Sequence, residues 1–158
     1  DSFKVKRLVR VGTCGALDER LKLRDILIAQ GADSDSGMNP SRFGLYQHAP
    51  TATFSLLQKA YAHALKAKVA FKVGNVFTTD QFYDLKSEEK LAHARSLGTL
   101  AVDMETSELY TLARLKNVEA LTLLSVSDSI LTGEQVPSKE RQNTFNAMID
   151  LALETLFS

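Results

Sequence analysis

Acidic side chains follow two apolar runs of this sequence, at the points where a helical pattern begins. One group is Val102-Asp103-Met104-Glu105-Thr106 and the other is Ser127-Asp128. If both runs are parallel strands, these residues lie at the carboxyl edge of one sheet, where open α/β folds bind ligands. A buried carboxylate is costly without a partner, so this edge is predicted to hold a ligand, a metal or a cation.

Glu105 is the acid with the most specific predicted role. It opens a predicted helix and shares a helix face with Leu109, Leu112 and Ala113, so we expect it to point inward. The helix dipole favours a negative charge at this end. A carboxylate there can accept hydrogen bonds from both hydroxyls of a ribose diol, and the alternative is a capping acid, a role that is also open to Glu108. Its neighbour Met104 suits either the core or an apolar sugar face.

Asp128 is predicted to pair with a cation from the last helix. Arg141 shares a face of that helix with Phe145, Met148 and Ala152. A cation on an apolar stripe needs an anionic partner or ligand, and Asp128 is the obvious candidate. Such a pair in a cleft can transfer a proton as a catalytic acid, and the alternative is a structural salt bridge.

The segment Arg10-Val11-Gly12-Thr13-Cys14-Gly15 is predicted to be a glycine turn after a strand. Arg10, Thr13 and backbone N–H groups could bind an anion there. It is not a dinucleotide fingerprint, and the alternative is a tight turn in which Arg10 pairs with a nearby acid. No histidine is near Cys14 in sequence, which favours a small buried residue over a nucleophile. Phe82, with Tyr83 beside it, suits either the flank of a planar ligand or the core.

Composition excludes several classes of function. The 158 residues include 19 basic and 19 acidic side chains and carry no net charge, which argues against nucleic-acid binding. No apolar run approaches the roughly 20 residues of a membrane span and no signal peptide is evident, so we expect a cytoplasmic protein without a membrane partner. The single cysteine fits a reducing compartment. The three histidines lack metal-ligand spacing, so no metal is expected.

Strand-like and helical segments alternate along the chain. The fold class is therefore predicted to be α/β, a single domain over residues 1–158 with a mostly parallel mixed sheet covered by helices. Strands are expected at residues 5–11, 25–32, 69–78, 100–104 and 120–126. Helices are expected at residues 53–66, 88–97, 105–116 and from 137 onward, with an irregular connection at 31–50. The chain begins without methionine and enters a strand almost at once, which is typical of the middle of a domain.

Five segments, taken together, resemble the bacterial hexameric, DeoD-type purine nucleoside phosphorylases. They are residues 10–16, 73–83, 102–106, 126–128 and 140–148, and the resemblance extends from about Lys6 to the end of the chain. It implies a nucleoside phosphorylase-like fold and reversible phosphorolysis of purine ribonucleosides or deoxyribonucleosides in purine salvage. Phosphate is then a co-substrate and no cofactor is needed. The resemblance also implies a homohexamer built as a trimer of dimers.

Residue roles follow from the same resemblance. Arg10 and Thr13 resemble phosphate ligands, Cys14 and Gly15 the backbone beside the base, and Phe82 the stacking aromatic. Val102 and Met104 resemble base and sugar contacts, and Glu105 the diol acceptor. Asp128 resembles the acid that protonates the purine N7, with Ser127 beside it and Arg141 assisting. Asp103 stands where the family usually has glutamate, so the purine preference is left open.

The family also has an amino-terminal segment before the first strand, which carries further phosphate-binding residues. The resemblance therefore implies a chain truncated at its amino terminus, and we expect it to be nearly inactive alone. Alternatives of the same fold are a uridine phosphorylase, which usually lacks the Ser127-Asp128 pair, and an adenosylhomocysteine-type nucleosidase, which would not need Arg10. A non-catalytic fragment or a nucleoside-binding module is the alternative from another class.

Overall fold

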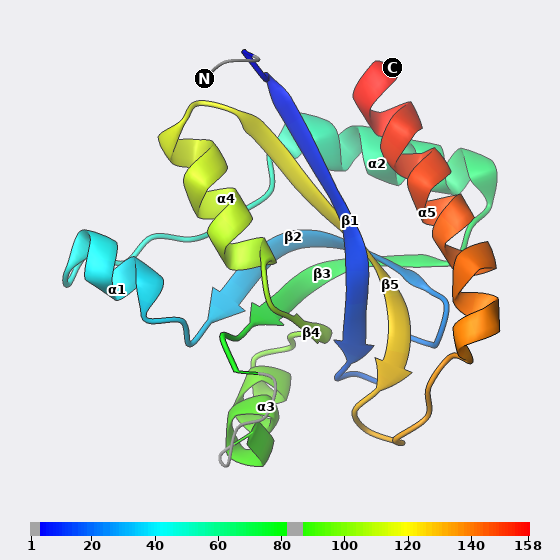
Figure 1. Cartoon of the computed structure of the whole chain (residues 1–158), viewed down its shortest axis with the longest axis horizontal. Helices are drawn as coiled ribbons and strands as arrows, with labels where there is room; N and C mark the ends of the chain where they lie inside the picture. The colour runs from blue at the N-terminus through cyan, green and yellow to red at the C-terminus, as the bar shows by residue number, and fades with distance from the viewer. Residues whose placement is uncertain (1–3, 82–86) are drawn as a thin grey trace.

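Five strands form a closed barrel in the part of the chain that the computed structural model describes, which is residues 4–81 and 87–158 without the side chains of residues 87 and 138–144 (Figure 1). The strands are β1 (Arg7–Ala16), β2 (Ile26–Ser34), β3 (Phe71–Thr78), β4 (Ala101–Asp103) and β5 (Glu119–Ser129). Their order around the barrel is β1-β4-β3-β2-β5.

The sheet is mixed. The pairs β1/β5, β2/β3 and β3/β4 are parallel, whereas β1/β4 and β2/β5 are antiparallel. The predicted α/β class is confirmed, but a mostly parallel sheet is too simple a description because two of the five pairings are antiparallel and the sheet closes on itself. Closure depends on the short strand β4, which bridges β1 and β3.

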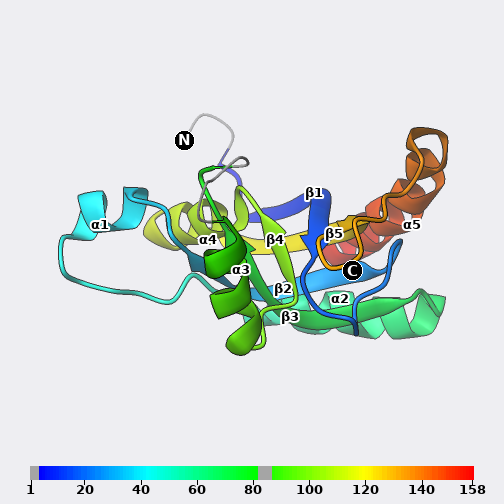
Figure 2. The same ribbon diagram turned by 90° about the horizontal axis from the view of Figure 1, so that it is seen from below.

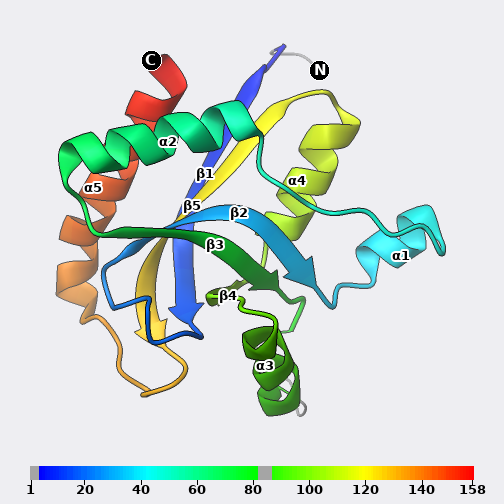
Figure 3. The same ribbon diagram turned by 180° about the vertical axis from the view of Figure 1, so that it is seen from behind.

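Helices cover the outside of the barrel. They are α1 (Met38–Phe43), α2 (Phe54–Ala67), α3 (Ser87–Ser96), α4 (Thr106–Leu115) and α5 (Ser138–Phe157). Helices α2 and α5 contact each other and cover one side, while α1 and α5 lie at opposite ends of the molecule (Figures 2 and 3). None of the described helices is long and apolar enough to cross a membrane.

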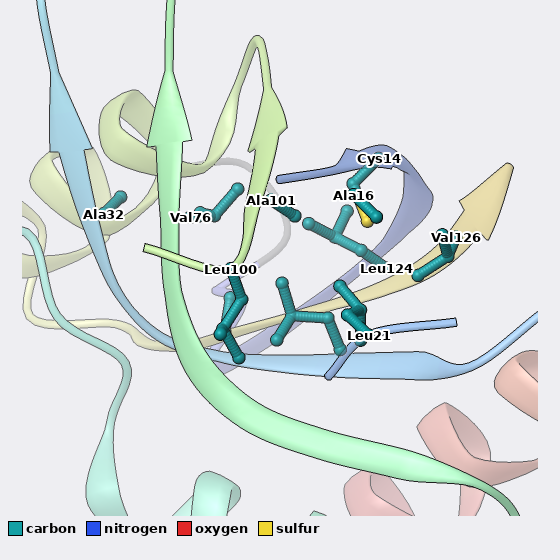
Figure 4. Packing of buried hydrophobic residues seen from close by; sticks show 11 residues of the cluster. Cys14, Ala16, Leu21, Ala32, Val76, Leu100, Ala101, Leu124 and Val126 are labelled. Atoms are coloured by element: carbon teal, nitrogen blue, oxygen red, sulfur yellow. The ribbon is translucent and has the colours of Figure 1, made fainter. Parts of the chain in front are cut away.

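Strand residues alternate between two apolar clusters, because successive side chains of a strand point to opposite faces. Leu124 and Val126 of β5 belong to the cluster that Figure 4 shows, together with Ala32 of β2 and Val76 of β3. Leu27 and Ala29 of β2 are buried in the same cluster. The outward-facing cluster joins β2 and β5 to the helices α2 and α5, and its buried members are Ile26, Ile28, Leu56, Ala60, Ala64, Leu121, Leu123, Met148, Leu151 and Ala152. Met148 and Ala152, which share the predicted apolar face of the last helix, are buried, whereas Ile149 is 42% exposed.

Three sequence predictions need correction. Residues 10–15 do not form a turn, because β1 continues to Ala16 beside β5 with one register shift after Cys14. The connection at 31–50 begins inside β2 and contains the short helix α1. In α4 the predicted face of Leu109, Leu112 and Ala113 is only partly right, since Leu112 is 41% exposed. The buried residues of α4 are Thr106, Ser107, Tyr110, Thr111 and Ala113.

Tyr110 ties α4 to the barrel where β2 and β5 separate. The antiparallel pairing of these strands ends at Ala29 and Thr122. The Tyr110 hydroxyl donates to the carbonyl oxygen of Ala29 at 2.5 Å and accepts from the amide of Thr122 at 2.9 Å. Burial is the main cause that raises the pKa of Tyr110 to about 12, so the hydroxyl stays protonated and able to donate at neutral pH.

Replacing Tyr110 by phenylalanine leaves a buried N–H and a buried carbonyl without this hydroxyl. We expect Tyr110→Phe to lower the free energy of unfolding by about 1–3 kcal/mol, the range for unsatisfied buried groups. Denaturant unfolding beside Tyr61→Phe, whose ring is 45% exposed, measures the difference. Equal losses in the two variants would show that the bridging hydroxyl does not hold the strands.

Candidate functional site

A pocket of about 420 Å³ lies where β1, β3, β4 and β5 end, next to α3. Ten of the twelve predicted site residues line it: Arg10, Thr13, Cys14, Gly15, Val102, Asp103, Met104, Glu105, Ser127 and Asp128. Phe82 lies outside the described residues. Arg141 is in α5, but its side chain is not described, so its pairing with Asp128 stays a prediction. The closed sheet therefore still gathers these residues at the ends of its strands.

A larger groove of about 980 Å³ lies between β2 and the segment around α1. None of the ten predicted site residues whose side chains are described lines it, and its walls are mainly loop residues from the connection between β2 and α2. The groups that could do chemistry are concentrated in the smaller pocket, which we therefore take as the candidate site. Volume alone does not identify a site, whereas convergent charged groups do.

Arg10 lies between two carboxylates of the pocket. Its Nη2 donates to Oε2 of Glu105, and its Nη1 lies 3.5 Å from Oδ2 of Asp103. The side chain of Arg10 is 20% exposed, that of Asp103 is fully buried, and that of Glu105 is 59% exposed. The alternative in which Arg10 pairs with a nearby acid is therefore seen in the structure, with the acids at and just after the end of β4 and not in a turn. The role of Arg10 as a phosphate ligand stays a prediction.

Asp103 is buried among donors from three segments. Its Oδ1 accepts from the hydroxyl of Thr78 at 2.7 Å, and its Oδ2 accepts from both the amide, at 3.1 Å, and the hydroxyl of Thr106. The Thr78 hydroxyl in turn accepts from the amide of Ser107 at 3.1 Å. These bonds tie β3, β4 and the first turn of α4 together, so the carboxylate of Asp103 holds Arg10 and the helix start from inside the protein.

Glu105 is the residue immediately before α4, at its cap position. Its carboxylate lies at the pocket rim and holds Arg10, which fits an acceptor that remains accessible to a ligand. The predicted inward direction is thus only half right, because the side chain faces the pocket and stays largely exposed. Met104 beside it is 38% exposed and also lines the pocket.

Asp128 and Ser127 lie on the far strand of the site, β5. The Ser127 hydroxyl donates to Oδ1 of Asp128 at 2.6 Å, and Asp128 is paired in register with Gly15 of β1. An isolated bridge to Gln135 also fixes the Asp128 backbone. The acid is therefore held at the pocket with a hydroxyl donor on one of its two oxygens.

Cys14 is a small buried residue, as predicted. It is 3% exposed, and its Sγ lies 3.9 Å from the carbonyl oxygen of Ser125. Burial first, and then the negative charges of Asp103 and Asp128, raise the pKa of the thiol far above its usual range. A thiol in this environment stays protonated and is a poor nucleophile.

Sequence analysis missed several residues of the pocket wall. They are Phe77, Thr79, Gln81, Lys90, Leu91 and Ile130. Phe77 and Ile130 lie near the ends of β3 and β5, so their position at a strand end could have identified them from the sequence. Lys90 and Leu91 are in α3, and the position of that helix relative to the sheet does not follow from the strand pattern. The apolar members of this group, Phe77, Leu91 and Ile130, together with Val102 give the pocket apolar walls suited to a planar ring.

No group of three or more histidine, cysteine, aspartate or glutamate side chains is arranged to hold a metal ion among the described residues. The charged residues described in the pocket lining are instead Arg10, Lys90 and the carboxylates Asp103, Glu105 and Asp128, and Lys90 pairs with Asp35 at 2.6 Å. Such a set can bind an anion and hydroxyl groups and can transfer a proton.

Comparison with known proteins gives one consistent family. Over 154 residues the chain is 54% identical to the DeoD-type purine nucleoside phosphorylase of Alkaliphilus metalliredigens, an alignment that covers 96% of this chain and 65% of that protein. It is 50% identical over 154 residues to the one from Thermoanaerobacter sp., covering 98% of this chain and 66% of that protein. It is 50% identical over 155 residues to the one from Geobacillus stearothermophilus, covering 98% and 65%.

The chain thus spans about 65% of the length of the curated relatives that it matches. The family model described as the phosphorylase superfamily matches residues 1–156, nearly the whole chain. On this match, and with the predicted residues gathered in one pocket, the chain belongs to the phosphorylase superfamily.

Proposed function

We propose that the pocket binds a purine nucleoside and phosphate and catalyses reversible phosphorolysis. A phosphate oxygen attacks C1′ of the pentose as the bond from C1′ to N9 breaks, which gives a free purine and a pentose 1-phosphate. The observation that carries the proposal is the position of Arg10 between Asp103 and Glu105, in one pocket with Asp128. A cation for phosphate, an acceptor for sugar hydroxyls and an acid for the leaving base are then within one site.

The proposed roles follow from charge. The transition state resembles an oxocarbenium ion, so the phosphate held by Arg10 and Thr13 stabilises the sugar cation while Asp128 protonates N7 of the base. Ser127 fixes one oxygen of Asp128, and Arg141 assists the acid from α5. Glu105 accepts from the ribose hydroxyls, and Val102, Met104 and Phe82 contact the base and the sugar. Cys14 and Gly15 line the base through their backbone, and no cofactor is required beyond phosphate as co-substrate.

We also propose that the protein works as a homohexamer, a trimer of dimers, in the cytoplasm. Large apolar side chains that are strongly exposed in the described chain support association: Leu45, Tyr46, Phe54 and Phe157. The relatives named above are purine nucleoside phosphorylases, which supports a nucleoside as substrate.

Product analysis tests the reaction type. The assay uses the intact enzyme, because the chain alone is expected to be nearly inactive. Inosine is incubated with and without inorganic phosphate, uridine is assayed in parallel, and the free base and pentose 1-phosphate are quantified. Phosphate-dependent release of both products is expected. Base release without phosphate would identify a hydrolase of the nucleosidase kind, and preferential cleavage of uridine would identify a pyrimidine enzyme.

Glu105→Ala tests the diol acceptor. We expect a loss of about 2–4 kcal/mol in transition-state stabilisation for inosine, the scale of charged hydrogen bonds lost from a site. The loss should be smaller for 2′-deoxyinosine, which offers one hydroxyl fewer. Glu108→Ala is the matched control, because Glu108 is a nearby glutamate in the first turn of α4 that pairs with Arg42 at 2.7 Å and does not line the pocket. Unchanged kcat/KM for inosine in Glu105→Ala would contradict the assignment.

Asp128→Asn tests the acid. If Asp128 protonates N7, the variant should lose far more activity on inosine than on 7-methylguanosine, whose cationic base already carries the charge that protonation supplies. The ratio of kcat/KM values for the two substrates is the measurement. Equal losses on both would mean that Asp128 has a structural role.

A further inference from the structure

Gly12 lies under the guanidinium of Arg10. Alternate residues of a strand share a face, so the side chain of Arg10 in β1 extends over position 12. A Cβ placed on Gly12 would lie 2.7 Å from Nη1, 2.9 Å from Cζ and 2.9 Å from Nη2 of Arg10. These separations are far below van der Waals contact, so the guanidinium occupies the space that any side chain at position 12 would need.

The guanidinium is held on its other sides by charge. Asp103 lies 3.5 Å from Nη1 and is fixed by buried hydroxyl and amide donors, while Glu105 holds Nη2 from the rim. Nη1 is itself buried and has no hydrogen-bond partner among the described residues. Its position is therefore set by packing on Gly12 and by the charge of Asp103, since no hydrogen bond at Nη1 fixes it.

We propose that Gly12 is a positioning residue that seats the Arg10 guanidinium between Asp103 and Glu105 for binding of a phosphate group. This inference rests on the proposed function, in which Arg10 is the phosphate ligand. Gly12 has no positive φ, so alanine can adopt the same backbone. The atoms that a methyl group would strike are the end of a flexible side chain, so Gly12→Ala displaces the Arg10 guanidinium and not the backbone of β1.

The test compares Gly12→Ala with Gly37→Ala in the intact enzyme. Gly37 is a matched control, because a Cβ there meets nothing within 4 Å and its φ of −72° suits alanine. We expect Gly12→Ala to raise the KM for phosphate about 10- to 100-fold, the range for a weakened charged hydrogen bond, and Gly37→Ala to leave it unchanged. The melting temperature of Gly12→Ala is expected to fall as well, because the buried carboxylate of Asp103 loses part of its compensating charge. A wild-type KM for phosphate in Gly12→Ala would overturn the inference.

A double-mutant cycle separates positioning from a general structural role. In Arg10→Lys the guanidinium is gone, so adding Gly12→Ala should change the KM for phosphate little further. Additive losses would show that the methyl group acts by another route and would overturn the proposal.

The binding of phosphate can also be measured without catalysis, through its effect on the melting temperature. The rise in melting temperature caused by inorganic phosphate should be present in the wild type and in Gly37→Ala and much reduced in Gly12→Ala. Phosphate stabilisation without phosphorolysis would overturn the proposed function and leave this inference standing. A crystal structure of Gly12→Ala is expected to show the guanidinium moved away from Asp103; a guanidinium still between the two carboxylates would overturn the inference whatever the activity.

Discussion

The site depends on the burial of one carboxylate, Asp103. A charge removed from water requires compensation, and a buried ion pair is stable only when further hydrogen bonds satisfy the remaining lone pairs. Thr78 and Thr106 supply those bonds, and Arg10 supplies the opposite charge. The carboxylate of Asp103 therefore fixes both the start of α4 and the position of Arg10 in the pocket. For this reason its structural and chemical roles cannot be separated.

Barrel closure is what brings these partners together. Arg10 is on β1 and Asp103 ends β4, and the antiparallel pairing of Gly15 with Val102 and Ala16 with Ala101 sets the two strands side by side. The parallel pairing of Thr78 with Asp103 adds the hydroxyl from β3. The three-residue strand β4 thus fixes how β1 and β3 are aligned at the site. It is held in place by its pairing with these two strands and by α4, which begins shortly after it.

The sequence predicted the elements better than their arrangement. The helix expected at 53–66 is α2 at Phe54–Ala67, because its apolar spacing and its flanking residues specify it locally. The acidic residues of the pocket were predicted because they end apolar strands, whereas Cys14, Gly15 and Val102 were assigned only through the resemblance of their segments to the family. Closure of the sheet could not be predicted, since it depends on pairings between strands distant in sequence. The inward face of α4 was only partly predicted. Hydroxyl side chains such as Thr106 and Thr111 are buried on it, whereas a pattern based on apolar residues places leucines there.

The glycines of β1 were misread for a physical reason that also explains their use. Gly12 and Gly15 predict a turn when read alone, but β5 runs parallel to β1 and supplies backbone partners throughout, so the chain stays extended. What the missing side chains provide is space. A Cβ at Gly12 would strike Arg10, and one at Gly15 would lie 2.9 Å from Oδ2 of Asp128. Gly12 leaves space for the guanidinium of Arg10, and Gly15 leaves space for the carboxylate of Asp128. Both glycines are in β1, and the proposed reaction needs both of these charged groups.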